Sequence, residues 1–116
     1  MPQDSLRIED RPETQPGQRV LSLTGPLVLT TVFDFQATVR AVQSRSLILD
    51  FAGVPYVDSA GIGALVGAYV TRQHSGRSLA LVGVNDRIHN ALKITQVEQF
   101  FRFFDSVSAA EEATAA

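Results

Sequence analysis

The segment Asp58-Ser59 has the clearest chemical potential in the chain, because it lies between an apolar strand-like run and a helical pattern. A helix N-terminus leaves its first backbone N–H groups without intrahelical partners, and the helix dipole favours negative charge there. A phosphate on Ser59 would therefore find hydrogen-bond donors without disturbing the fold. A capping role for the Ser59 hydroxyl explains the same residues, so a modification site and a plain N-cap both remain open.

The helix that begins at Ser59 and ends near His74 is predicted to have two contrasting faces. Its apolar stripe follows helical spacing and comprises Ile62, Leu65, Val66, Tyr69 and Val70. The opposite face comprises Ala60, Gly63, Ala64, Gly67, Ala68 and Thr71. A glycine inside a helix costs about 1 kcal/mol relative to alanine, so two glycines on an outward face require a reason. Close approach of a partner protein is one reason, and cover by another part of the same chain is the other.

Motifs of other functional classes are incomplete. No Gly-x-Ser-x-Gly elbow surrounds Ser59, and neither His74 nor His89 has a second ligand at a metal-binding spacing. The glycine-rich segment after Ser59 has Val66 where a dinucleotide fingerprint needs glycine or alanine. A phosphate-binding P-loop is excluded because the only lysine is Lys93. We therefore expect a protein that is not an enzyme, with no catalytic residues, metal or cofactor.

Length and composition limit the class of protein further. A chain of 116 residues with 45% hydrophobic content corresponds to one domain. The net charge of −2, with no basic run, argues against a direct nucleic-acid partner. The absence of cysteine fits a cytoplasmic protein. The longest apolar run, Ala60–Val70, is 11 residues against the roughly 20 that a membrane span needs, and no signal peptide is visible, so we expect no membrane insertion.

The elements that position Asp58 and Ser59 alternate between strand and helix periodicities. Strand patterns cover Leu6–Glu9, Arg19–Thr24, Leu47–Phe51, Leu79–Val82 and Phe100–Phe104. Helical patterns begin near residues 31, 59, 85 and 106. The expected caps are a Thr31–Asp34 capping box, Gly76 at a C-terminus, and Asn85 or Asp86 and Ser106 at N-termini. The order β-β-α-β-α-β-α-β-α predicts an α/β fold with a mostly parallel five-stranded sheet, about four helices and one antiparallel hairpin.

The segment from Val57 to Leu65, after the strand Leu47–Asp50, resembles the signature of STAS domains, specifically that of the bacterial anti-sigma factor antagonist family. The resemblance runs from about Leu6 to Val107. It includes Leu23-Thr24-Gly25, Thr31 and Leu81-Val82-Gly83 at matching places. It implies a single STAS domain over residues 5–113, followed by a frayed tail at 114–116.

The resemblance implies a protein that works by partner switching. In that family an unphosphorylated antagonist binds an anti-sigma factor, which is usually also a serine kinase, and so frees a sigma factor. The kinase then phosphorylates the serine after the aspartate, here Ser59, and a serine phosphatase resets it. The implied partner-binding residues are Asp58, Ser59, Ala60, Gly61, Gly63, Ala64 and Gly67. ATP would belong to the kinase, and we expect this chain to be a monomer or weak dimer.

Two departures from the family pattern stand out, and two other functions stay open. Val28 follows Gly25-Pro26-Leu27 where the family commonly has an acidic residue associated with kinase engagement. Thr95-Gln96-Val97 replaces a common Thr-Gly-Leu turn. The first alternative is the STAS subunit of an ABC-type lipid-transport complex, which would dock the same helix face on an ATPase. The second is a small ligand-binding protein of flavodoxin-like type.

Overall fold

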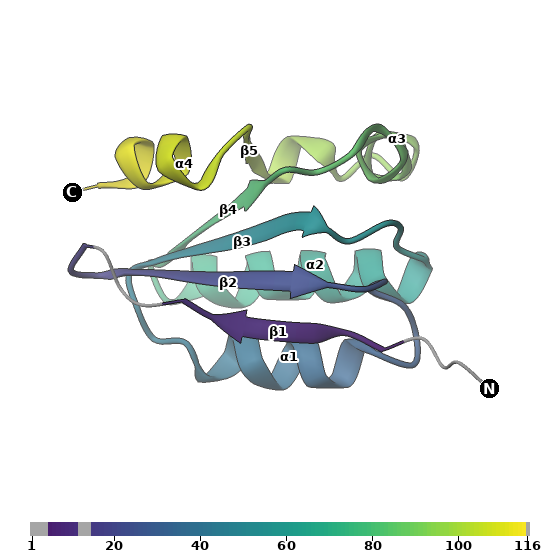
Figure 1. The fold of residues 1–116 in the computed structure, drawn as a ribbon, viewed down its shortest axis with the longest axis horizontal. Helices are drawn as coiled ribbons and strands as arrows, with labels where there is room; N and C mark the ends of the chain where they lie inside the picture. Colours follow the sequence, from purple (N-terminus) through teal and green to yellow (C-terminus); the bar gives the residue numbers. More distant parts are fainter. Residues whose placement is uncertain (1–4, 12–14, 116) are drawn as a thin grey trace.

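The computed structural model describes residues 5–11 and 15–115, and within them the strands form one five-stranded sheet in the order β1-β2-β3-β4-β5 (Figure 1). The strands are β1 (Arg7–Asp10), β2 (Gln18–Thr24), β3 (Ser46–Gly53), β4 (Ser78–Val82) and β5 (Arg102–Phe104). The helices are α1 (Val32–Ala41), α2 (Ser59–His74), α3 (Asp86–Ile94) and α4 (Val107–Thr114), with a short 3-10 helix at Glu98–Phe100. The predicted order of elements is confirmed.

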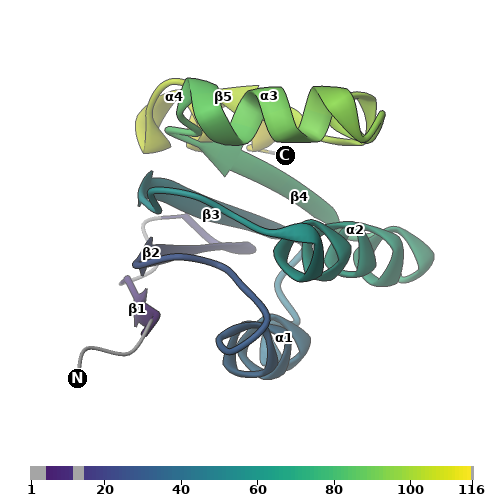
Figure 2. The same cartoon turned by 90° about the vertical axis from the view of Figure 1, so that its right-hand side faces the viewer.

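The pairing of the strands matches the predicted mixed sheet. β1 runs antiparallel to β2, with Ile8 opposite Leu23, and the other neighbouring strands are parallel. The three helices that connect parallel neighbours pack on one face, because right-handed crossovers between consecutive strands always turn to the same side. Figure 2 shows α1 and α2 side by side against the sheet. This order differs from the doubly wound order 2-1-3-4-5, so a flavodoxin-like architecture is wrong for this chain.

The core has two layers because residues along each strand alternate between the faces of the sheet. Leu47 and Leu49 of β3 pack in the large cluster under α1, α2 and α3, while Ile48 packs in a smaller cluster with Ala110 of α4. The nearly continuous apolar run of β3 therefore follows from cover on both faces, as predicted. Phe35 of α1 has no exposed surface, and the large cluster fixes α1 beside α2.

Most predicted helix ends are confirmed. Gly76 follows the C-cap of α2 with φ +70°, a conformation that glycine adopts without strain. Asn85 caps α3 by accepting a hydrogen bond from the Ile88 N–H, and Ser106 caps α4. The predicted tail at 114–116 begins one residue too early. Thr114 still belongs to α4 and accepts a hydrogen bond from the Gln18 side chain, whereas Ala116 lies outside the described residues.

Two local predictions are wrong. The Thr31 side chain does not cap α1, because its Oγ1 accepts a hydrogen bond from the Val28 N–H and donates to the Pro26 carbonyl. The Thr31 side chain therefore closes the loop before α1 and does not cap the first turn of that helix. The predicted strand Phe100–Phe104 is also shorter, because the chain first completes the 3-10 helix and pairs with β4 only from Arg102 onward.

Candidate functional site

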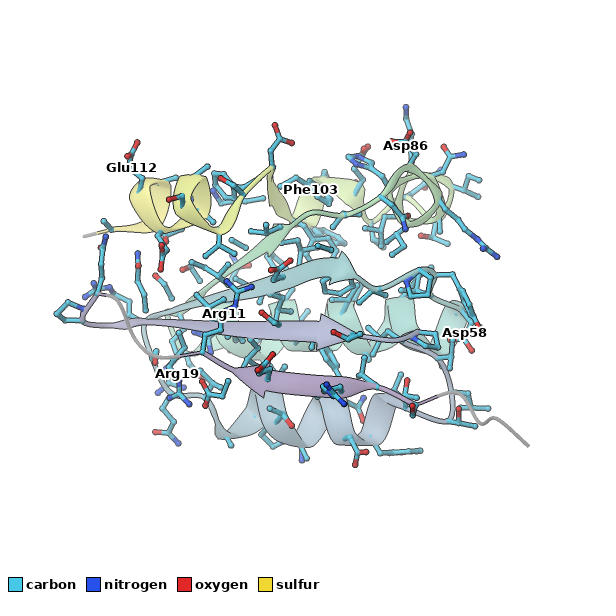
Figure 3. The ribbon with its side chains drawn as sticks, in the orientation of Figure 1. Arg11, Arg19, Asp58, Asp86, Phe103 and Glu112 are labelled. Carbon is cyan, nitrogen blue, oxygen red and sulfur yellow. The ribbon has the colours of Figure 1, made fainter. Side chains whose placement is uncertain are left out.

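The site begins at the carboxyl ends of β2 and β3, where two loops lie against each other. A parallel bridge joins Leu27 and Val57, and the Leu27 N–H donates to the Tyr56 carbonyl. The Asp58 N–H in turn approaches the Leu27 carbonyl at 3.4 Å. These contacts place the start of α2 beside the loop that leads into α1, and Figure 3 shows Asp58 at this end of the sheet.

Asp58 is the residue that caps α2. Its Oδ1 accepts a hydrogen bond from the Gly61 N–H at 2.9 Å, in the extended backbone conformation typical of an N-cap. Its Oδ2 accepts a second bond, from the Leu29 N–H at 3.0 Å. One carboxylate therefore satisfies a free amide of the helix and also ties down the neighbouring loop. The interpretation of Ser59 as the N-cap is wrong, because Asp58 has that role.

Ser59 is the first residue of α2 and its side chain is exposed. Within the part of the chain that the structure describes, its hydroxyl has no hydrogen-bond partner. The backbone N–H groups of Ser59 and Ala60 also have no acceptor among these residues, whereas the Ile62 N–H donates to the Asp58 carbonyl. An exposed hydroxyl and two helix-terminal amides are thus available together, which is the arrangement that accommodates a phosphate.

Gly61 is buried and faces the protein. A Cβ at this position would lie 2.1 Å from the Leu27 carbonyl oxygen and 3.2 Å from the Val57 side chain. The glycine is therefore required by the close approach of the loop before α1. The prediction that Gly61 belongs to the partner-binding surface is wrong, because the residue is buried against the loop before α1. Gly61 instead sets the position of the helix start.

The exposed face of α2 is rotated from the predicted one. Ala64 and Ala68 are only 4% and 8% exposed, and they pack in the core that includes Phe35. Val70, a member of the predicted apolar stripe, is 44% exposed. The assignment of Ala64 to a partner surface is thus wrong. The reason is that this side of α2 faces α1, whose Phe35 and Val39 belong to the same core cluster as the two alanines.

Gly63 and Gly67 do face solvent, as predicted. A Cβ built at either residue has no neighbouring heavy atom within 4 Å. No packing within the described chain therefore requires glycine at these two positions. With Ser59 they form an exposed line of small residues along α2, and Ala60 at its side is half-buried. Nothing among the described residues accounts for the two glycines.

Two apolar side chains that the sequence analysis did not single out extend this surface. Leu29 is 63% exposed and Phe33 is 70% exposed, and the Leu29 amide is bound to Asp58. By helical spacing Phe33 shares its side of α1 with Gln36 and Arg40, two residues that line the cleft between α1 and α2. Phe33 does not share the helical spacing of the buried Val32, Phe35 and Val39, and that spacing is the signal by which the sequence could have indicated an exposed aromatic side chain. We call Leu29, Phe33, Ser59, Gly63 and Gly67 the Ser59 surface.

Val28 lies behind this surface. Its side chain is only 6% exposed, and its carbonyl accepts hydrogen bonds from the N–H groups of Thr31 and Val32, each at 2.9 Å. Residue 28 is thus buried inside the loop that leads into α1. Among the described residues no three His, Cys, Asp or Glu side chains are grouped so that they could hold a metal ion, and no helix there is long and apolar enough to cross a membrane.

Comparisons with known proteins agree on the fold. A family model described as STAS domain matches residues 11–110. An anti-sigma factor antagonist from Mycobacterium paratuberculosis superposes with a TM-score of 0.85 at 18% identity, covering 97% of both chains. The anti-sigma factor antagonist SpoIIAA in its unphosphorylated form gives 0.75 at 14% identity, over 95% of this chain and 98% of that one. Its phosphorylated form, from Bacillus, gives 0.71 at 14% identity, over 92% and 99%.

A transporter shares the same fold. The murine Solute Carrier 26 family member A9 anion transporter matches with a TM-score of 0.78 at 25% identity. The match covers 91% of this chain but only 19% of the transporter, so there the fold is a small part of a much longer protein. The fold therefore occurs both in chains of this length and within a membrane transport protein, and it does not by itself decide between the two settings.

Proposed function

Because this chain belongs to the STAS domain family, we propose that it is an anti-sigma factor antagonist that binds its partner through the Ser59 surface until Ser59 is phosphorylated. The observation that carries the proposal is the separation of roles at the start of α2, where Asp58 holds the helix while the Ser59 hydroxyl stays free. A similar protein, SpoIIAA, has both an unphosphorylated and a phosphorylated form. The proposed role is one of binding and regulation rather than catalysis.

Binding follows from the composition of the Ser59 surface. Leu29 and Phe33 offer exposed apolar side chains, and their burial against a partner would be favourable at about 25 cal/mol per Å². Gly63 and Gly67 leave the backbone of α2 bare, so that a partner helix or loop can approach closely. All five side chains of the surface are uncharged. A partner can therefore cover this surface without removing any charge from water.

Release follows from the charge that phosphorylation adds. A phosphoserine carries about −1.5 to −2 charges at pH 7. The free N–H groups of Ser59 and Ala60 at the helix N-terminus would tolerate it, so the fold stays intact. At the interface the same charge lies next to the Asp58 carboxylate and has no cation in the Ser59 surface to pair with. Burying it would cost several kcal/mol, and each 1.4 kcal/mol lowers affinity about tenfold.

The partners are proposed on the same basis. An anti-sigma factor that is also a serine kinase would bind the Ser59 surface and then modify Ser59, and a serine phosphatase would restore binding. The nucleotide would belong to the kinase. The whole cycle is expected in the cytoplasm, with this chain as a monomer or weak dimer.

Titration calorimetry with the cognate anti-sigma factor tests the proposal. We expect Ser59→Ala to bind as the wild type does and Ser59→Asp to bind at least about ten times more weakly. Ser108→Asp is the matched control, because it adds the same charge at an exposed site near the N-terminus of α4. Equal affinities of the two Ser59 variants would contradict the switch. Equal losses in Ser59→Asp and Ser108→Asp would show a general charge effect.

A role in transport is the second candidate, because the fold also occurs as part of the murine anion transporter. As the subunit of an ABC-type lipid-transport complex, the chain would present the same α2 face to an ATPase. Capture of partners from the native host with wild type and Ser59→Asp separates the two functions. Recovery of an ABC ATPase with both baits would favour transport, and recovery of an anti-sigma factor with the wild type alone would favour the switch.

A further inference from the structure

A cleft remains between α1 and α2, next to the Ser59 surface, with which it shares Gly67. It has a volume of about 160 Å³ and lies between Phe35 and Val39 of α1 and Ala64 and Ala68 of α2. The alanines are the reason for the opening, because no long side chain of α2 fills the space beside α1. An apolar cavity of about 150 Å³ accommodates benzene. The walls therefore suit an apolar group of about that size.

Three guanidinium groups also line this cleft, and no carboxylate does. They belong to Arg40 of α1, Arg72 of α2 and Arg77 in the turn before β4. Within the described residues none of the three forms an ion pair with an acidic side chain. In a chain whose net charge is −2, three unpaired cations around one cavity mark it as a site that favours an anion.

Arg72 is the buried member of the three, with 3% of its surface exposed. Its side chain donates hydrogen bonds to the carbonyl oxygens of Val42, Ser44 and Ser78, at 3.1, 2.5 and 2.8 Å. These bonds connect α2 to the start of β4 and to the loop before β3, which is a structural role. They satisfy three of its N–H groups but leave the positive charge without a counter-ion.

The charge of Arg72 is destabilised where it lies. Burial and, as the smaller cause, the nearby positive charge of Arg77 together lower the pKa of Arg72 to about 10. Both effects disfavour the cation, and an anion between the two side chains would oppose both. A purely structural role for Arg72 explains its carbonyl contacts, but it does not explain why Arg77 and Arg40 are placed at the same cavity.

We propose that the cleft binds a small carboxylate whose apolar body is about the size of benzene. The carboxylate lies at Arg77 and Arg40, near the charge of Arg72, and the apolar body lies between α1 and α2. This inference does not depend on Ser59 or on the proposed function.

Benzoate is the probe, and benzyl alcohol is its uncharged counterpart of similar shape. Titrations of the whole chain by NMR should show saturable benzoate shifts at the amides of Ala64 and Ala68 in the millimolar range. Benzyl alcohol should bind at least about ten times more weakly. Arg77→Gln and Arg40→Gln should each weaken benzoate but not benzyl alcohol. Arg7→Gln is the matched control, since it removes the same charge on the exposed strand β1.

Three results would overturn the proposal. The first is no saturable shift at Ala64 and Ala68 with benzoate. The second is equal affinity for benzoate and benzyl alcohol. The third is an equal loss of benzoate affinity in Arg7→Gln and Arg77→Gln, which would reduce the effect to the net charge of the protein. Thermal unfolding of each variant checks that it is folded, and Arg40→Gln provides the charge test if Arg77→Gln is not.

Discussion

The glycines of α2 should respond to alanine with opposite signs. At Gly61 the new methyl group would lie 2.1 Å from the Leu27 carbonyl oxygen and 3.0 Å from the Leu27 carbonyl carbon. Carbon and oxygen that are not bonded stay more than 3 Å apart, so the backbone must move by about 1 Å. Such overpacking costs about 1–3 kcal/mol. Because the obstacle is backbone rather than a flexible side chain, we expect Gly61→Ala to destabilise by about 2–3 kcal/mol.

At Gly63 and Gly67 the same substitution meets nothing within 4 Å. Alanine is about 1 kcal/mol better than glycine inside a helix, and both residues lie in the interior of α2. Each single variant should therefore be more stable than the wild type by about 0.5–1 kcal/mol. For a domain of this size, 1 kcal/mol corresponds to a change in melting temperature of about 4 °C.

Urea unfolding of the three single variants, followed by circular dichroism, measures these changes. A wild-type stability for Gly61→Ala would refute the close contact with Leu27. A loss of stability in Gly63→Ala or Gly67→Ala would show that α2 is covered on this side. Binding gives a second, independent outcome. If a partner lies close to the Ser59 surface, Gly63→Ala should bind the anti-sigma factor more weakly although it is the more stable protein.

Three further predictions concern stability and can be checked by urea unfolding. Asp58→Ala should cost about 2 kcal/mol, because it removes the cap of α2 and the bond to the Leu29 N–H. Val28→Asp, which introduces the acidic residue that the resemblance leads us to expect there, should cost at least about 2 kcal/mol, because residue 28 is buried. The Arg19 guanidinium holds the pKa of the Asp10 carboxyl below its ordinary value of 3.8. Because the folded pKa is the lower one, the pair stabilises above about pH 4 and is lost as the pH falls through the folded pKa. On this exposed pair the effect should stay below about 1 kcal/mol and disappear in Arg19→Gln.

The succession of strands and helices could be predicted because each element has a clear local pattern. The β3 run Leu47-Ile48-Leu49 indicates a strand covered on both sides, and Asn85 and Ser106 are typical N-caps. Thr31 has the same local signature as a cap, yet its hydroxyl bonds the loop before α1. The competing partner lies in a turn whose shape depends on tertiary contacts, so the spacing alone could not decide.

The orientation of α2 could not be predicted, because the helix offers little contrast between its faces. From Ile62 to Val70 every residue is apolar or small, so a stripe of large side chains can be drawn in more than one way. Size suggested that Val70 lies inside and Ala64 outside. The position of α1 reverses both, because α1 lies on the side of α2 that holds Ala64 and leaves Val70 exposed. The burial of Gly61 likewise depends on a carbonyl of a distant loop, which no local pattern reveals.

The double hydrogen bond of Asp58 has a consequence for how such a domain can diverge over evolutionary time. Because both carboxylate oxygens serve the architecture, natural selection on residue 58 is selection on folding. Residue 59 carries no structural duty among the described residues, so threonine, alanine or an acidic residue there leaves the scaffold intact. Under the proposed switch, descendant genes can thus gain, lose or fix a regulatory state by one substitution while the ancestral fold is inherited unchanged.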